Sequence, residues 1–134
     1  MKQYLLTGGR IKFLNFGFPC LLLYTTGAKS GLERRTVLTY FIENNEYYLI
    51  ASNGGSDKHP SWFYNLKKCP TVKIVVDGKK YNVLAEEISI QDKKEYWKKI
   101  NKFFSGRYDK YQNSTDRQIP VCLLYTSPSP RDRG

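Results

Sequence analysis

Residues 25–36 combine residue types that bind anions. Besides two glycines, this stretch contains a lysine, a serine and two arginines: Lys29, Ser30, Arg34 and Arg35. Arginine makes paired hydrogen bonds to phosphate or carboxylate, hydroxyl groups donate to oxyanions, and glycine lets backbone N–H groups approach a ligand closely. The spacing predicts an anion-binding loop between two strands. A basic turn that serves solubility alone is the alternative.

Residues 51–56, with the sequence ASNGGS, place small side chains where an expected strand ends before an expected helix. At Ser52, Asn53 and Gly54 no bulky side chain stands between the backbone and a flat ring lying against it. The pattern indicates a surface for a planar ligand. An ordinary strand-to-helix connection is the alternative.

Tyr108 and Tyr111 stand three residues apart after an amphipathic segment, so in a helix they share one face. Phenol groups in that position could wall a pocket and donate hydrogen bonds to a carbonyl oxygen, while simple packing is the alternative. His59, the one histidine, precedes Pro60, and no nucleophile or carboxylate stands at motif spacing to it. Its position favours a role at a helix start over one as general base or metal ligand.

The period of the apolar residues predicts the elements that position these groups. Strands are expected at residues 19–25, 36–42, 47–52, 71–76, 81–87 and 119–121, and helices at 59–67 and 92–104. The pairs Asn44-Asn45 and Asp77-Gly78 favour tight hairpins. These elements predict a mainly β fold with α-helices, of about six antiparallel strands and two helices. Closing the sheet into a small barrel would remove its edges.

The length of 134 residues suits one hydrophobic core, and therefore one domain. We expect that domain to span residues 1–121, because residues 122–134, CLLYTSPSPRDRG, read like a translated sequencing adapter and are predicted to be a non-native tail. The longest apolar run is too short to span a membrane, and the start lacks the apolar region of a signal peptide. The sequence therefore predicts a cytoplasmic protein. Three widely spaced cysteines, without a CxxC pair, predict neither a disulfide framework nor a metal site.

The chain is basic and aromatic. It has 22 Lys and Arg residues against 12 Asp and Glu, which gives a formal net charge of +10, together with 11 Tyr, 7 Phe and 2 Trp. Such a composition suits ligands that are both planar and anionic. Nucleic acid, an anionic membrane surface and a phosphorylated flavin-like cofactor all meet that description, and composition does not choose among them.

Five blocks of sequence, in order, resemble the deazaflavin (F420)-dependent nitroreductase family, also called F420-dependent quinone reductases. The blocks are residues 22–31, 34–36, 51–55, 59–66 and, last, 111–112 with 116–121. The resemblance implies a split β-barrel of the flavin-binding type and an oxidoreductase. It also implies coenzyme F420 as the carrier of a hydride to a quinone or nitroaromatic acceptor, because in this family the cofactor supplies the hydride and the protein positions it.

The resemblance also assigns roles to residues. Cofactor-binding roles fall on Lys29, Ser30, Arg34, Arg35, Ser52, Asn53 and Gly54, and a place beside the substrate on Tyr40, Tyr108 and Tyr111. Asn53 and Ala28 stand where many relatives have a basic residue, and Ser105 stands where a further tyrosine is expected.

A short segment before Pro19 implies at most peripheral membrane contact, and a homodimer is possible for this fold. Two alternatives stay open. One is a basic barrel that binds single-stranded nucleic acid, and the other is a split barrel that binds FMN or heme. The family resemblance leads us to expect no nucleic-acid partner.

Overall fold

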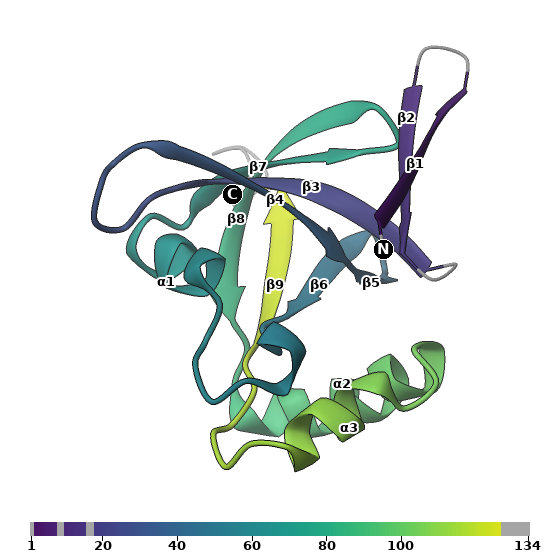
Figure 1. The fold of residues 1–134 in the computed structure, drawn as a ribbon, viewed down its shortest axis with the longest axis vertical. Helices are drawn as coiled ribbons and strands as arrows, with labels where there is room; N and C mark the ends of the chain where they lie inside the picture. The colour runs from purple at the N-terminus through teal and green to yellow at the C-terminus, as the bar shows by residue number, and fades with distance from the viewer. Residues whose placement is uncertain (1, 8–9, 16–17, 127–134) are drawn as a thin grey trace, which may run out of the picture.

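The computed structural model describes residues 2–7, 10–15 and 18–126, and its strands form one antiparallel sheet (Figure 1). The strands are β1 (Lys2–Thr7), β2 (Arg10–Asn15), β3 (Phe18–Thr26), β4 (Glu33–Thr39), β5 (Phe41–Glu43), β6 (Glu46–Ile50), β7 (Thr71–Val76), β8 (Lys79–Glu87) and β9 (Val121–Thr126). Their order is β1-β2-β3-β7-β8-β9-β6-β5, and β4 pairs with β3 along the edge opposite β7.

Helices cover two parts of this sheet. They are the 3-10 helix η1 (Asn53–Gly55) and the α-helices α1 (Ser61–Lys68), α2 (Ile90–Phe103) and α3 (Arg107–Asn113). Figure 1 shows α2 and α3 side by side at the end of the sheet from which β9 begins, and α1 beside the long β3–β4 hairpin. Helix α1 thus lies beside the predicted anion-binding loop, η1 falls within residues 51–56, and α3 carries Tyr108 and Tyr111.

Local sequence explains the two predicted tight turns. Asn44 and Asn45 have φ values of 55° and 64°, and Asp77 and Gly78 have 52° and 80°. Both central residues are left-handed, as a two-residue hairpin loop requires, and Asn, Asp and Gly tolerate that conformation best. Both predicted hairpins, β5–β6 and β7–β8, are confirmed.

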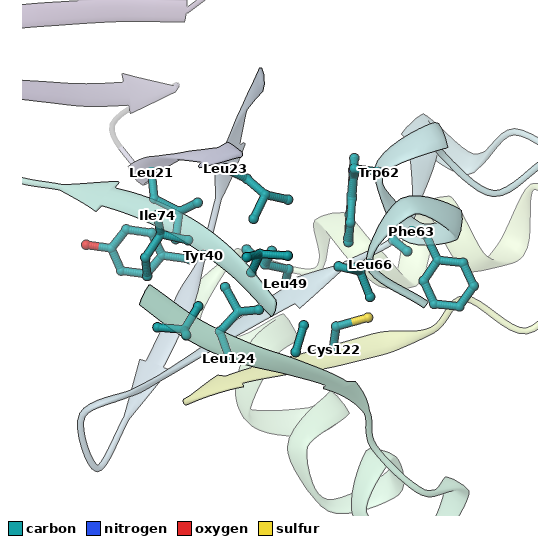
Figure 2. Packing of buried hydrophobic residues seen from close by; sticks show 14 of the residues in the cluster. Leu21, Leu23, Tyr40, Leu49, Trp62, Phe63, Leu66, Ile74, Cys122 and Leu124 are labelled. Atoms are coloured by element: carbon teal, nitrogen blue, oxygen red, sulfur yellow. The ribbon is translucent and has the colours of Figure 1, made fainter. Parts of the chain in front are cut away.

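The core consists of two clusters on opposite sides of β6. Leu49 belongs to a cluster that includes residues of β3, β7, β9 and α1, and Figure 2 shows it among Leu21, Leu23, Ile74, Leu124, Trp62 and Leu66. Ile50, the next residue, belongs to a second cluster with Ile100 of α2, Phe104 directly after that helix, and Tyr108 of α3. Consecutive strand residues point to opposite faces, so β6 joins the two clusters.

The predicted class, mainly β with α-helices, is confirmed, but its details differ. The described residues contain nine strands in place of about six and three α-helices in place of two. The predicted strand 36–42 is divided at Tyr40, and the last strand begins at Val121 where residues 119–121 were expected. Closure is wrong for the described strands, because β4 pairs only with β3 and β5 only with β6. The circuit of hydrogen bonds therefore stays open between β4 and β5.

The last described strand continues past residue 121, where we expected the domain to end. β9 pairs with both β6 and β8, and Cys122 and Leu124 are fully buried. Residues 127–134 lie outside the described part of the chain, so the adapter origin of 122–134 stays a prediction. Among the described residues, no helix is long and apolar enough to span a bilayer.

Candidate active site

A cleft of about 1270 Å³ lies between the β3–β4 hairpin, the end of β6, η1, the start of α1 and the start of α3. Nine of the ten predicted site residues line it: Lys29, Ser30, Arg34, Arg35, Ser52, Asn53, Gly54, Tyr108 and Tyr111. The structure therefore brings together side chains up to 82 positions apart in the sequence, namely Lys29 and Tyr111.

One end of the cleft is cationic. Lys29, Arg34 and Arg35 are exposed on the hairpin, where an anion could reach all three. Ser30 shapes the tip, because its hydroxyl oxygen accepts from the Leu32 N–H at 3.1 Å and from Arg34 Nη2 at 3.5 Å. The predicted anion-binding loop is thus a structured tip whose cationic residues border the cleft.

Helix α1 fastens this hairpin tip through Asn65, which is only 7% exposed. Its Oδ1 accepts from the Ala28 N–H at 2.8 Å, and its Nδ2 donates to Thr25 Oγ1 at 3.1 Å. Lys68 Nζ donates to the Ala28 carbonyl oxygen at 2.8 Å. Both backbone polar groups of Ala28 are therefore held by α1, and we name this arrangement the Asn65 clamp. No local signal in the sequence pointed to Asn65 as a site residue.

The strand end after β6 makes the central wall. Ser52 is buried, and its N–H donates to the Ile50 carbonyl oxygen at 2.8 Å, so this N–H is engaged within the protein. Asn53, Gly54 and Gly55 follow with φ values of 48°, 64° and 86°. A Cβ at Gly54 would meet no atom within 4 Å, which fits the predicted open surface for a ring.

The tyrosine wall comes from α3. Tyr108 is 4% exposed, and its hydroxyl shares a hydrogen bond of 2.8 Å with Thr39 Oγ1. Burial raises the pKa of Tyr108, and a hydrogen bond with Thr39 opposes that rise, so the group is a neutral phenol at neutral pH. The ring of Tyr111 lies edge-on to that of Tyr108, with centroids 5.8 Å apart. Both residues line the cleft from one helix face, as the spacing predicted.

Tyr40 lies elsewhere. Its side chain is 8% exposed and belongs to the first core cluster, as Figure 2 shows, and its ring meets that of Tyr47 at 5.1 Å. Burial and nearby charge raise the pKa of Tyr40 to about 12. Thr39, the last residue of β4, borders the cleft, whereas the side chain of Tyr40, in the break between β4 and β5, packs into the core. The structure therefore does not place Tyr40 beside a substrate.

The family model described as F420H(2)-dependent quinone reductase matches residues 2–126. The chain belongs to this family. That match confirms the predicted family and, with it, the predicted class of F420-dependent oxidoreductase.

Three individual matches illustrate the similarity to known proteins. F420H(2)-dependent quinone reductase Rv1261c of Mycobacterium tuberculosis is 40% identical over 121 residues, which are 88% of this chain and 81% of the relative. The solved structure of F420-H2 Dependent Reductase (FDR-A) is 39% identical with a TM-score of 0.72, over 80% of this chain and 94% of that one. A solved domain-swapped dimer matches equally well, at 39% identity and a TM-score of 0.72, over 80% of each chain.

More distant solved structures share the fold alone. The heme storage protein HutZ from Vibrio cholerae matches with a TM-score of 0.64 at 13% identity, over 82% of each chain. A FAD-binding protein from Mesorhizobium loti matches with a TM-score of 0.55 at 13% identity, over 96% of this chain and 94% of that one.

The residues of the cleft fit the cofactor that the family name carries. Coenzyme F420 joins a planar ring to an anionic tail, and the cleft has a cationic tip at one end and a backbone surface without bulky side chains beside it. The charge and shape of the residues that border the cleft thus agree with the family.

Proposed function

We propose that this protein transfers a hydride from reduced coenzyme F420 to a quinone or nitroaromatic acceptor bound in the same cleft. The observation that carries the proposal is the meeting of three surfaces in one cleft: the cationic tip, the open strand end and the tyrosine wall. The family of the chain supports the same reaction.

The cationic tip would hold the anionic tail of the cofactor. Lys29, Arg34 and Arg35 supply positive charge at one end of the cleft, and the Asn65 clamp fixes the backbone that carries them. Charge-assisted hydrogen bonds from such groups are about twice as strong as neutral ones. The tip therefore supplies much of the affinity and sets the direction in which the ligand lies.

The strand end would receive the ring system. Ser52, Asn53 and Gly54 border it, and the Cβ position of Gly54 is open. F420 supplies the hydride when bound, and the protein contributes orientation and exclusion of water. FMN is an alternative occupant of the same surface, because it is also a planar phosphorylated ring.

The tyrosine wall would face the acceptor. Tyr111 is half-buried and borders the cleft, so its phenol can donate a hydrogen bond to an acceptor carbonyl oxygen. The hydroxyl of Tyr108 is paired with Thr39, and this pair holds the ring of Tyr108 in place beside Tyr111. Tyr111 is therefore the stronger candidate for direct contact with the acceptor.

Three wider features belong to the same proposal. The likeness to HutZ and to the FAD-binding protein supports a split β-barrel of the flavin- and heme-binding type. The domain-swapped neighbour supports a homodimer. A cytoplasmic location with at most peripheral membrane contact stays a prediction from the sequence.

The test measures the affinity for F420 of Lys29→Ala, Arg34→Ala and Arg35→Ala by cofactor fluorescence at two ionic strengths. Each variant should bind F420 about 5- to 150-fold more weakly, the range for loss of a hydrogen bond to a charged group. Lys79→Ala removes an equal charge from the exposed first residue of β8 and serves as control, with affinity like wild type.

Parallel titrations with FMN and with single-stranded DNA separate the alternatives. A DNA binder spreads its phosphate contacts over many lysines, so single substitutions would change the salt dependence slightly and leave binding in place. Wild-type affinity for F420 in all three variants would contradict the assignment of the tip. Submicromolar DNA binding without cofactor uptake would contradict the proposed function.

A further inference from the structure

Arg117 lies behind the cleft, outside its lining, and its guanidinium group donates to four acceptors in residues 51–59. Nε donates to the Ser56 carbonyl oxygen at 2.8 Å, and Nη2 to that of Ser52 at 2.7 Å. Nη1 donates to the Ala51 carbonyl oxygen at 3.2 Å and to His59 Nδ1 at 2.8 Å. One side chain thus donates hydrogen bonds on both sides of η1, which forms the middle of the central wall.

The central wall needs such a partner because most of it lacks regular structure. Between the end of β6 and the start of α1 the backbone forms only η1, whose residues all have positive φ. Buried carbonyl groups outside strands and helices must find other donors. The planar fork of arginine can satisfy several at once, which a lysine ammonium on a flexible stem cannot match.

Neighbouring contacts hold Arg117 itself in place. Gln112 on α3 clamps the backbone around it, donating from Nε2 to the Arg117 carbonyl oxygen at 2.7 Å and accepting from the Ile119 N–H at 3.0 Å. Thr115 donates to Asp57 Oδ1 at 2.7 Å, and Ser114 to the Gly55 carbonyl oxygen at 3.0 Å. Segments 112–119 and 51–59 are therefore joined at several points, with Arg117 at the centre.

The bond to His59 determines the state of that ring. Arginine cannot lose its proton in a protein, so His59 Nδ1 must accept, and the proton of the neutral ring is on Nε2. Burial lowers the pKa of His59, and the charge of Arg117 lowers it further, against a weaker opposite effect of Glu87. The ring packs on Phe63, with centroids 4.8 Å apart, and His59 lines the cleft.

We propose that Arg117 is a positioning residue that holds residues 51–59 in shape and fixes His59 as an uncharged ring. The single N–H of that ring, on Nε2, then donates a hydrogen bond to an oxygen atom of the bound cofactor. The proposal rests on the proposed function as far as the identity of that cofactor is concerned. Its statement about the ring of His59 does not depend on any ligand.

The ring is tested first, in the ligand-free wild-type protein. His59 is the only histidine of the chain, so long-range ¹H–¹⁵N spectra of the imidazole, recorded after removal of any affinity tag, report this residue alone. We expect the Nε2–H tautomer to predominate at pH 7. A protonated Nδ1, either in the other tautomer or in a charged ring, would overturn the proposal.

The second test compares F420 affinity among variants. Arg117→Lys keeps the charge and loses the fork, and His59→Phe keeps the ring and loses its donor. Each should weaken F420 binding by about tenfold or more, the scale for losing hydrogen bonds to an ionised ligand. Arg117→Lys should also allow both tautomers of His59. Lys110→Ala removes one charge from an exposed position of α3 and should bind like wild type.

Wild-type affinity in both Arg117→Lys and His59→Phe would overturn the proposal even if the tautomer is as expected. Should Arg117→Lys fail to fold, the spectrum of the wild-type protein and the affinity of His59→Phe still decide. Wild-type protein that takes up no F420 would contradict the proposed function, and the spectrum would still confirm or overturn the assigned state of the ring.

Discussion

Replacing Asn65 by leucine tests whether helix α1 holds the cationic tip. Leucine has nearly the same shape as asparagine and can make neither hydrogen bond of the clamp. The substitution leaves the Ala28 N–H without its acceptor at 2.8 Å and Thr25 Oγ1 without its donor at 3.1 Å. The contact from Lys68 to the Ala28 carbonyl oxygen would remain.

The magnitude follows from these contacts. Each hydrogen bond contributes about 0.5 to 1.5 kcal/mol, and a partly buried N–H left without a partner costs about 1 kcal/mol more. The free energy of unfolding should therefore fall by about 2 to 4 kcal/mol. For a chain of this length, a loss of 1 kcal/mol lowers Tm by about 3 to 5 °C. The expected loss in Tm is thus roughly 6 to 20 °C.

Calorimetry and F420 titration together make the assay. Because the clamp sets the backbone from which Lys29 projects, F420 affinity should fall by about tenfold in Asn65→Leu, and excess F420 should recover part of the lost Tm. Asn82→Leu makes the same chemical change at an exposed position of β8, away from the cleft, and is the matched control. A Tm within about 1 °C of wild type and unchanged affinity would show that the β3–β4 ladder alone holds the tip.

Two further predictions concern the other walls of the cleft. Tyr108→Phe and Thr39→Val should each lower the free energy of unfolding by about 1 kcal/mol, because each removes the same hydrogen bond. In urea unfolding the double variant should therefore lose clearly less than the sum of the two single losses. Full additivity would refute the pairing. Gly55→Ala should lower the free energy of unfolding by about 1 to 3 kcal/mol more than Gly54→Ala. Both positions have positive φ, but only at Gly55 would a Cβ meet Ser114 Oγ and the Tyr111 carbonyl oxygen. Equal losses in urea unfolding would mean that α3 does not pack closely on η1.

Local patterns predicted those parts of the fold that nearest neighbours along the chain determine. Asn44-Asn45 and Asp77-Gly78 predicted two hairpins, and the 3.6-residue period predicted α2, whose start at Ile90 is fixed by Ser89 Oγ accepting from the Asp92 N–H at 3.1 Å. The β1–β2 hairpin was missed, although Gly8-Gly9 between two apolar runs is a turn signal.

Contacts between distant parts of the chain account for the rest. Asn65 and Arg117 meet partners 37 to 66 positions away. Both stand in blocks that carry the family resemblance, but no role was assigned to either of them. The family resemblance implied a place beside the substrate for Tyr40, while the structure packs its side chain in the core. Sequence thus indicated which residue types a cofactor needs, and only the fold showed which residues hold them in place.

The position of β9 determines how much of the chain must be made before the sheet can form. This strand follows every other described strand along the chain, yet it lies between β8 and β6 within the sheet. Without it, the strands on its two sides have no common partner, and without Arg117, which precedes it, the wall of residues 51–59 lacks its donor. A nascent chain that stops before residue 117 should therefore expose apolar surface to chaperones and bind no cofactor, so binding of F420 reports that synthesis has passed β9.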